Sequence, residues 1–222
     1  MNAVFCPEHP QRCSASLRLR EDNAFVYPID ERDKVFELPD VPKPCGGAPM
    51  PLVVADEDVL LLSYFVMQSA SAQTEQKASI ATIRFDRALM HLLGPPNDEA
   101  IKGHPLWKRG LDSYCMYRVD ESSLIRRLAA MNYVHPRNNP ALYDDFHHYV
   151  FTFHDSTFEC VAQSYASVID EIRDQSERCG RLAEMFRVRN ERSRSEMFGI
   201  LERPSFKVRL RWWIDLLNPW SR

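Results

Sequence analysis

The stretch HHYVFTFHDSTFECVA, residues 147–162, decides the fold because it reads as two strands joined by a tight bend. Aromatic and β-branched residues dominate YVFTF and TFECVA, and such residues favour strands. Between them, His154, Asp155 and Ser156 are polar residues of the kind that favour turns. We therefore expect an antiparallel pair of strands whose successive side chains face opposite sides.

Three more segments upstream show strand patterns. PLVVADEDVLLLSYFV (51–66) has two apolar runs around three acidic residues, which predicts a strand, an acidic turn and a second strand. Alternation in SIATIRF (79–85) predicts another strand, while residues 86–94 fit either a strand or a helix. LDSYCMYRV (111–119) also reads as a strand.

Two segments show helical patterns. Ser122 or Ser123 can cap a helix over residues 123–134, which ends before Pro136 because the residue before proline avoids the helical region. A second helix is expected from Val168 to about Arg189, interrupted by Gly180. Its apolar positions are Val168, Ile172, Leu182, Met185 and Phe186. The chain is therefore expected to be an α+β protein, with an antiparallel β-sheet and helices packed on one face.

Composition limits the classes of protein that fit. The chain has 222 residues, of which 45% are hydrophobic, enough to bury a core. A net charge of −3 argues against a nucleic-acid coat. The longest apolar run, Val59 to Met67, is too short to span a bilayer. With no export signal and six scattered cysteines, we expect free thiols and a cytoplasmic location.

Three regions are expected along the chain. Residues 1–45 form a proline-rich arm, in which Ala24–Tyr27 and Val35–Leu38 fit edge strands or extended pieces. Residues 46–195 form the α+β domain. Residues 196–222 contain three of the four tryptophans and are expected to dock on that domain or on a partner chain.

Four segments also carry a resemblance. They are GAPMPLVVADEDVLLLSYF, GPPNDEAIKGHPLWKRGL, NYVHPRNNP and HHYVFTFHDSTFECVA. Together they resemble a group of uncharacterised bacterial proteins over residues 46–165. The resemblance implies that this region is the domain proper, and it implies no activity, ligand or catalytic residue.

The first candidate site surrounds the bend of the opening stretch. His135, His154 and Glu159 supply imidazole and carboxylate ligands for zinc or another divalent metal. Without a metal, His154, Asp155 and Glu159 could act in acid–base catalysis, with Asp155 orienting His154. His148 lies on the same strand face as His154 but about 20 Å away, too far to share one ion. The structural alternative is that Phe151 and Phe153 face the core while His154 faces water.

Cys160 could serve as a nucleophile near this bend. On a strand that also carries Phe158 and Ala162 on the same face, it more readily acts as a small buried hydrophobic residue. No cysteine-protease motif surrounds it.

The second candidate site is the loop GPPNDEAIKGHPLWKRG (94–110). Asn97, Asp98, His104 and Arg109 could line a ligand pocket, with the basic residues meeting an anionic group. The alternative is structural, in that Asn97 and Asp98 cap a turn while Trp107 anchors the loop.

Two further patterns lie near the chain ends. Cys6, His9, Cys13 and Cys45 are zinc-type ligands, although a proline-rich terminus explains the same residues. Arginines beside aromatic residues in FKVRLRWW can suit nucleic acids, but glutamates interleave nearby and docking on the domain or a partner explains the tryptophans. Nucleic-acid binding is therefore not expected.

The leading hypothesis is a non-enzymatic cytoplasmic domain that binds a partner protein or a small ligand, because no catalytic motif has the required spacing. The alternative is a metal-dependent or acid–base enzyme, hydrolase-like, centred on His135, His154, Asp155 and Glu159. A homodimer is compatible with either.

Overall fold

The computed structural model describes residues 27–67 and 77–201, with the side chains of 189–201 left undescribed. The strands are β1 (Lys34–Glu37), β2 (Leu52–Ala55), β3 (Leu60–Phe65), β4 (Ala78–Asp86), β5 (Met90–Gly94), β6 (Met116–Asp120), β7 (His147–Thr152), β8 (Thr157–Ala162) and β9 (Ser164–Ile172). The helices are α1 (Ser123–Met131) and α2 (Gln175–Leu201), with short 3₁₀ helices η2 (Ile101–Gly103), η3 (Pro105–Arg109), η4 (Asn132–Val134) and η5 (Pro140–Tyr143).

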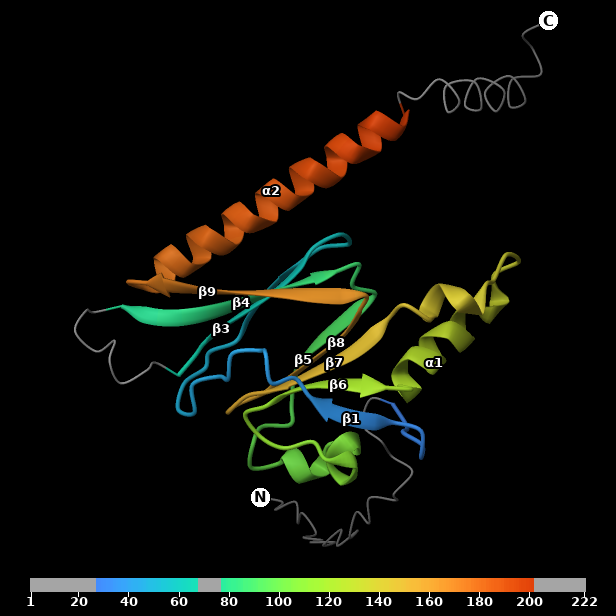
Figure 1. Ribbon diagram of the computed structural model, residues 1–222, viewed down its shortest axis with the longest axis horizontal. Helices are drawn as coiled ribbons and strands as arrows, with labels where there is room; N and C mark the ends of the chain where they lie inside the picture. Colours follow the sequence, from blue (N-terminus) through green and yellow to red (C-terminus); the bar gives the residue numbers. More distant parts are fainter. Residues whose placement is uncertain (1–26, 68–76, 202–222) are drawn as a thin grey trace, which may run out of the picture.

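The strands form two antiparallel sheets (Figure 1). The five-stranded sheet has the order β1-β6-β7-β8-β5, and the four-stranded sheet has the order β2-β3-β4-β9. The opening hairpin pairs as expected, with Phe151 opposite Phe158 and Val150 opposite Glu159. The α+β class and the antiparallel pairing are thus confirmed, and the structure adds that the strands divide between two sheets.

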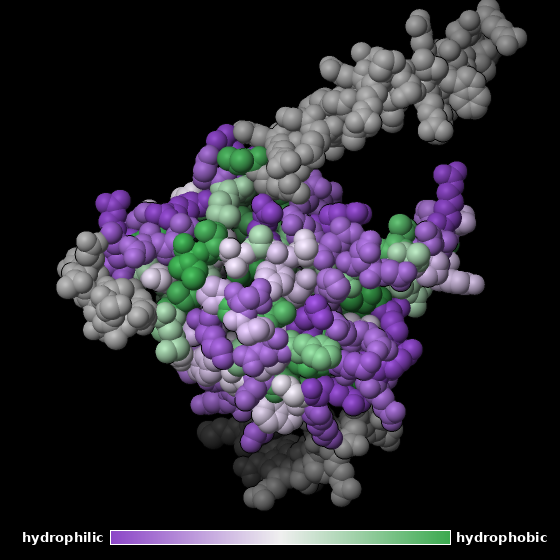
Figure 2. Space-filling model, in the orientation of Figure 1, coloured by the Kyte–Doolittle hydropathy of each residue, from purple (hydrophilic) through white to green (hydrophobic). Residues whose placement is uncertain are grey.

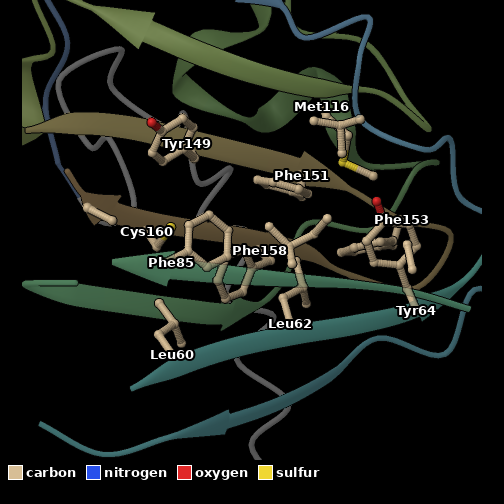
Figure 3. Close-up of a cluster of buried hydrophobic side chains, with 14 of the residues drawn as sticks. Leu60, Leu62, Tyr64, Phe85, Met116, Tyr149, Phe151, Phe153, Phe158 and Cys160 are labelled. Carbon is tan, nitrogen blue, oxygen red and sulfur yellow. The ribbon is translucent and has the colours of Figure 1, made fainter. Parts of the chain in front are cut away.

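The main core lies between the two sheets (Figure 3). The alternating pattern of β4 places Ala81, Ile83 and Phe85 on the inner side, where Phe85 stacks on Phe158 at 5.7 Å between ring centroids. Phe151 meets the same two rings edge-on. Phe151 and Phe153 face this core, as the structural alternative for the hairpin expected. Cys160 is buried among them.

The outer face of the five-stranded sheet is covered as well. The η2–η3 loop packs Ile101, Leu106 and Leu111 against Val119 and Val150. A neighbouring cluster contains Tyr27, Leu124, Phe146 and Val161, so α1 and the segment before β1 complete this layer. Both faces of β7 and β8 are therefore buried along almost their whole length, including polar residues such as His148 and Glu159.

Helix α2 covers the outer face of the four-stranded sheet. Leu182 packs on Val59 and Leu61, with Met185 and Phe186 beside it. The helix runs past the sheet and away from the domain (Figure 1). The helix was expected to begin at Val168, but Val168 and Ile172 belong to β9 instead, which pairs with β4 along its whole length. Gly180 does not interrupt the helix.

Part of the expected N-terminal arm, residues 27–45, is described and packs with the domain. Val35 pairs with Val119 as part of β1, and Tyr27 is buried in the domain. The expected cysteine and histidine ligands before residue 27 and the tryptophans after residue 201 lie outside the described residues. Cys45 is described and is a free thiol.

Candidate functional site

The hairpin β7–β8 carries two separate histidine clusters. The first is a buried cluster under the outer layer, formed by Tyr27, His104, Ser122, His148 and Glu159. The second is a half-buried cluster at the surface beyond the end of β7, formed by Asp98, Tyr114 and His154, and we call it the surface cluster. The sequence suggested His154 and Glu159 for one centre, whereas each has its own set of partners.

Glu159 is the centre of the buried cluster, and it is only 5% exposed. Its Oε2 accepts a hydrogen bond of 2.6 Å from the Tyr27 hydroxyl and lies 2.8 Å from Nε2 of His148. Its Oε1 lies 3.1 Å from Nε2 of His104. Three donors from three distant segments therefore meet on one carboxylate.

The hydrogen bonds fix the tautomers of both histidines. Nδ1 of His104 accepts from the backbone N–H of Leu106 at 3.1 Å, so its proton is on Nε2, facing Glu159. Nδ1 of His148 lies 3.0 Å from the Ser122 hydroxyl, which can donate to it while Nε2–H donates to Glu159. Both ring nitrogens of each histidine therefore have a hydrogen-bonding neighbour.

The ionised state of Glu159 follows from competing effects. Burial raises the pKa of Glu159, but the hydrogen bonds from His104 and His148, together with the electrostatic attraction of these two side chains, outweigh burial and lower the pKa below its usual range. Burial and the nearby charge of Glu159 raise the pKa of Tyr27 well above its ordinary value, so its hydroxyl stays a donor. The cluster joins four segments of the chain.

The buried cluster does not suit a metal. A ligating histidine normally donates its second N–H to a neighbour, whereas Nδ1 of His104 accepts, which leaves Nε2 protonated and unable to coordinate. Within residues 27–67 and 77–201, no group of three or more histidine, cysteine, aspartate or glutamate side chains could hold a metal ion. The predicted set of His135, His154 and Glu159 is not brought together.

The surface cluster pairs His154 with Asp98 rather than with Asp155. Nδ1 of His154 lies 2.8 Å from Oδ2 of Asp98, whereas Nε2 lies 3.9 Å from Asp155, which is 88% exposed. The backbone N–H of Asp98 also donates to the carbonyl of His154, which ties the loop to the bend. Asp98, assigned by sequence to a different site, is therefore the residue that orients His154.

Tyr114 completes the surface cluster. Its hydroxyl donates to Oδ2 of Asp98 at 2.5 Å, and its ring stacks on the imidazole of His154. The hydrogen bond to Asp98 raises the pKa of Tyr114 to about 12. Hydrogen bonds from Tyr114 and His154 lower the pKa of Asp98, and the bond to Asp98 raises the pKa of His154. With Nδ1–H fixed on Asp98, Nε2 is the atom of His154 that exchanges protons.

The other predicted site residues have structural contacts. Asn97 accepts from the N–H of Ala100, as expected for a turn cap, and Arg109 donates to the carbonyl of Asp30. His135 is exposed after η4 and accepts from the N–H of Arg137. Burial raises the pKa of the Cys160 thiol well above its ordinary value, which disfavours the thiolate that a nucleophile needs.

A hollow of about 460 Å³ lies between β9 and the start of α2, away from both clusters. Its walls are charged side chains that pair with one another, such as Arg181 with Asp170 at 2.9 Å. No residue of the two clusters lines it.

Sequence reasoning missed Tyr27, Ser122 and Tyr114 as members of these clusters. Tyr27 lies 132 residues from Glu159, so no local spacing could have joined them. In the sequence, Tyr114 was only part of a predicted strand, and Ser122 was only a possible cap of the following helix.

Comparison with protein-family models, with curated proteins and with solved structures finds no match to this chain. Its class therefore rests on the fold, a two-sheet α+β domain with helices outside both sheets. Among the described helices, none is both long enough and apolar enough to cross a membrane. The cytoplasmic location expected from the sequence stays a prediction.

Proposed function

We propose that this chain is a protein-binding domain that docks through the projection formed by α1, η4 and η5. The observation that carries the proposal is a group of four large apolar side chains with 58–89% exposure within twelve residues. We call this group the apolar tip, and its members are Met131, Tyr133, Val134 and Leu142. Large exposed apolar groups on a folded domain mark interaction surfaces.

The base of the projection supports this role. Leu124 and Phe146 are buried against Tyr27 and Val161, so both ends of the projection are anchored to the five-stranded sheet. The tip lies beyond these anchors, and hydrophobic side chains gather on the projection at the right of the view (Figure 2). A rigid base and an apolar end allow docking without a large loss of conformational entropy.

The size of the apolar tip points to a weak or transient partner. Four such side chains expose on the order of a few hundred Å² of apolar surface. A stable protein interface buries about 800 Å² per partner. The tip is therefore suited to be the centre of a modest interface, with polar residues around it, rather than the whole of an obligate dimer.

The test begins with a photo-crosslinking residue at Tyr133, introduced into the full chain in its source cell. The proteins that crosslink at this position are purified. Their affinity is then measured for the wild type and for the double variant that carries Tyr133→Ser and Val134→Ser. We expect at least tenfold weaker binding of the double variant. The control is Ile169→Ser, which removes an apolar side chain that is 57% exposed on β9. Equal affinity of wild type and double variant would contradict the proposal.

A second candidate function is proton transfer by His154. It is supported by the hydrogen bond of 2.8 Å that fixes Nδ1 on Asp98 and leaves Nε2 to accept a proton. In a panel of hydrolysis and proton-transfer assays, any activity that belongs to this site should fall at least about 100-fold in His154→Gln. Activity that survives in that variant would belong elsewhere.

A further inference from the structure

Strand β9 is the longest sheet edge among the described strands (Figure 1). The other edge strands, β1, β2 and β5, have four or five residues each, whereas β9 has nine. Natural proteins protect their sheet edges by keeping them short, or by placing lysine, proline or a bulge in the edge strand. Residues 164–172 contain no lysine or proline, and their register with β4 runs without a bulge. This edge therefore lacks the usual protection against pairing with another chain.

The side chains in the middle of β9 are open to solvent. Residues 166–169 are all exposed, and they include two large apolar side chains, Val168 at 42% and Ile169 at 57%. Helix α2 leaves this edge uncovered because it lies over β3, where Leu182 packs on Leu61. A strand from another chain can therefore approach β9 in the plane of the sheet.

The outward-pointing backbone groups of β9 follow from the hydrogen bonds of its neighbour. The carbonyl of Ser79 accepts from the N–H of Val66, so Ser79 directs its backbone groups toward β3. Successive residues of an antiparallel strand direct theirs to opposite sides, so Thr82 bonds toward β9, where Val168 is its partner. The N–H and C=O groups at the alternate positions 165, 167, 169 and 171 therefore point away from the sheet.

We propose that two copies of this chain pair antiparallel through β9, about a twofold axis at Ser167, and so join their four-stranded sheets. In this register Tyr165 of each copy lies opposite Ile169 of the other copy, and Ser167 lies opposite itself. All three positions direct their backbone groups outward, so each matched pair exchanges two hydrogen bonds. The proposal goes beyond the proposed function and does not depend on the apolar tip.

The apolar side chains of β9 favour this register. Tyr165 packs against the main core, and Ile169 is opposite Ala81 of the same core, so both lie on the side of β9 that faces the other sheet. Their pairing across the axis brings an aromatic ring against a β-branched side chain, a favourable cross-strand contact. On the other side of the strand, Ala166 meets Val168. The two most exposed apolar side chains of the edge thus gain apolar partners.

The charges of β9 explain why a second copy fits. Its charged side chains are Asp170 and Glu171, both near its C-terminal end. With the axis at Ser167, they lie opposite Ser164 and Gln163, which carry no charge, and the acidic ends of the two copies are about 20 Å apart. An axis at Asp170 would instead place like charges opposite each other, which destabilises a pair. The uncharged half of the strand is therefore the complement of its acidic half.

Pairing through β9 gives a closed dimer. The joined sheet would end in β2 of each copy, a strand of four residues, so the dimer offers no further long edge in that sheet. One pair of edge strands buries less than the roughly 800 Å² per partner of a standard stable interface. We therefore expect a reversible dimer with a dissociation constant in the micromolar range.

Sedimentation equilibrium of the full chain measures its mass between about 1 and about 300 µM, where a dimer of this strength dissociates. We expect the mass to rise with concentration from that of one chain toward that of two. Amide hydrogen exchange tests the register without any variant. Protection of residues 165, 167 and 169 should rise with concentration, whereas residues 166 and 168, which already bond to β4, should change less.

Two variants of the edge test the interface. Ser167→Pro removes an outward N–H and none of the bonds to β4, so the fold should remain while the dissociation constant rises at least about tenfold. Ile169→Lys places a charge opposite Tyr165 and should weaken the dimer by a similar factor. The matched control is Phe36→Lys, because Phe36 is 48% exposed on the edge strand of the other sheet, and this variant should dimerise as the wild type does. Circular dichroism checks that each variant is folded.

Three results would overturn the proposal. One is a chain that stays monomeric at every concentration, which would leave the edge to a different protein. Another is a dimer in which protection rises at none of residues 165, 167 and 169. The third is a dimer that both edge variants form as tightly as the wild type. The double variant Tyr133→Ser with Val134→Ser should remain dimeric, so the edge and the apolar tip can fail their tests separately.

Discussion

Glu159 stabilises the fold through three donors, and the removal of its charge tests that role. In Glu159→Gln, the side-chain amide would place its own N–H groups against donors from Tyr27 and the two histidines. We expect the free energy of unfolding to fall by about 2–4 kcal/mol, because buried hydrogen bonds to a charged group are lost and donors are left unsatisfied. Urea denaturation at pH 7 measures this change in the free energy of unfolding. Glu171→Gln, at an exposed pair with Lys77, should change stability by at most about 1 kcal/mol.

The lowered pKa of Glu159 also sets a pH dependence. A carboxyl group with a folded pKa below its unfolded value, which is near 4.5, stabilises the fold above that value. The stabilisation is lost as the pH falls through the interval below about 4.5, since the unfolded chain then binds the proton first. Urea midpoints should therefore drop below pH 5 in the wild type. A Glu159→Gln variant with an equally steep drop would show that other carboxylates cause it.

His154 allows the same reasoning at an exposed site. The hydrogen bond to Asp98 raises the pKa of His154, so Asp98→Asn should bring that pKa down towards the ordinary value of 6.5. NMR titration of the imidazole measures the change. Asp155→Asn is the control and should have a smaller effect, because its carboxylate is 3.9 Å away and exposed. A larger shift in Asp155→Asn would mean that Asp155 is the orienting residue.

The sequence could identify these side chains but not their partners. Asp98 and His154 are 56 residues apart, and they meet because the loop that carries Asp98 bonds to the bend after β7. Hydrophobic alternation tells which face of a strand a residue occupies, and it correctly placed Phe151, Phe153 and Cys160 in the core. It carries no information about which loop covers that strand.

Among the elements, α2 depends on one buried cation. The guanidinium of Arg178 donates to the carbonyls of Met50 and Ser63 and to the Ser63 hydroxyl, and it lies 5.1 Å from the ring centroid of Phe65. Burial lowers the pKa of Arg178. These contacts join the first turns of α2 to β3 and to the segment before β2.

Replacing that cation should detach the start of the helix. We expect Arg178→Ala to lower the free energy of unfolding by about 2–4 kcal/mol, because two carbonyls lose their donors and a cavity is left. Hydrogen exchange should increase most at residues 175–188. The matched control is Arg173→Ala, whose side chain is 78% exposed and whose loss should change stability by at most about 0.5 kcal/mol. Unchanged protection of α2 in Arg178→Ala would contradict this role.

Strand β9 shows where local pattern is ambiguous. Val168 and Ile172 are four residues apart, a spacing that fits one face of a helix and equally one face of a strand. Pairing with β4 makes this segment a strand, with Val168 opposite Thr82 and Ile172 opposite Ala78. The helix then begins only at Gln175, with Asp174 accepting from the N–H of Glu177 in its first turn.

For the whole molecule, the α+β class could be predicted because both periodicities are present in the sequence. The division into two sheets could not, because strand patterns do not specify partners. The available signal was the three consecutive apolar residues 149–151 of β7, because a strand that is apolar on both faces is buried between two layers. Those layers are the four-stranded sheet on one side and the loop with α1 on the other.

The shared core predicts that the two sheets unfold together. Phe158 on β8 contacts Phe85 on β4 across the sheet interface, so Phe158→Ala removes packing from both sheets at once. We expect a loss of about 3–5 kcal/mol, the usual effect of truncating a buried phenylalanine. Phe36→Ala is the control, because Phe36 is 48% exposed on β1 and should lose less than about 1 kcal/mol.

Hydrogen exchange near the urea midpoint distinguishes joint from separate unfolding. If the core couples the sheets, amides of β3 and β4 and amides of β7 and β8 report the same opening free energy, and Phe158→Ala lowers it equally for both groups. If the sheets were independent units, the variant would lower protection in the five-stranded sheet and leave β3 unchanged. Joint loss is expected because Leu60, Leu62 and Tyr64 of β3 pack in the same cluster as Phe158 (Figure 3).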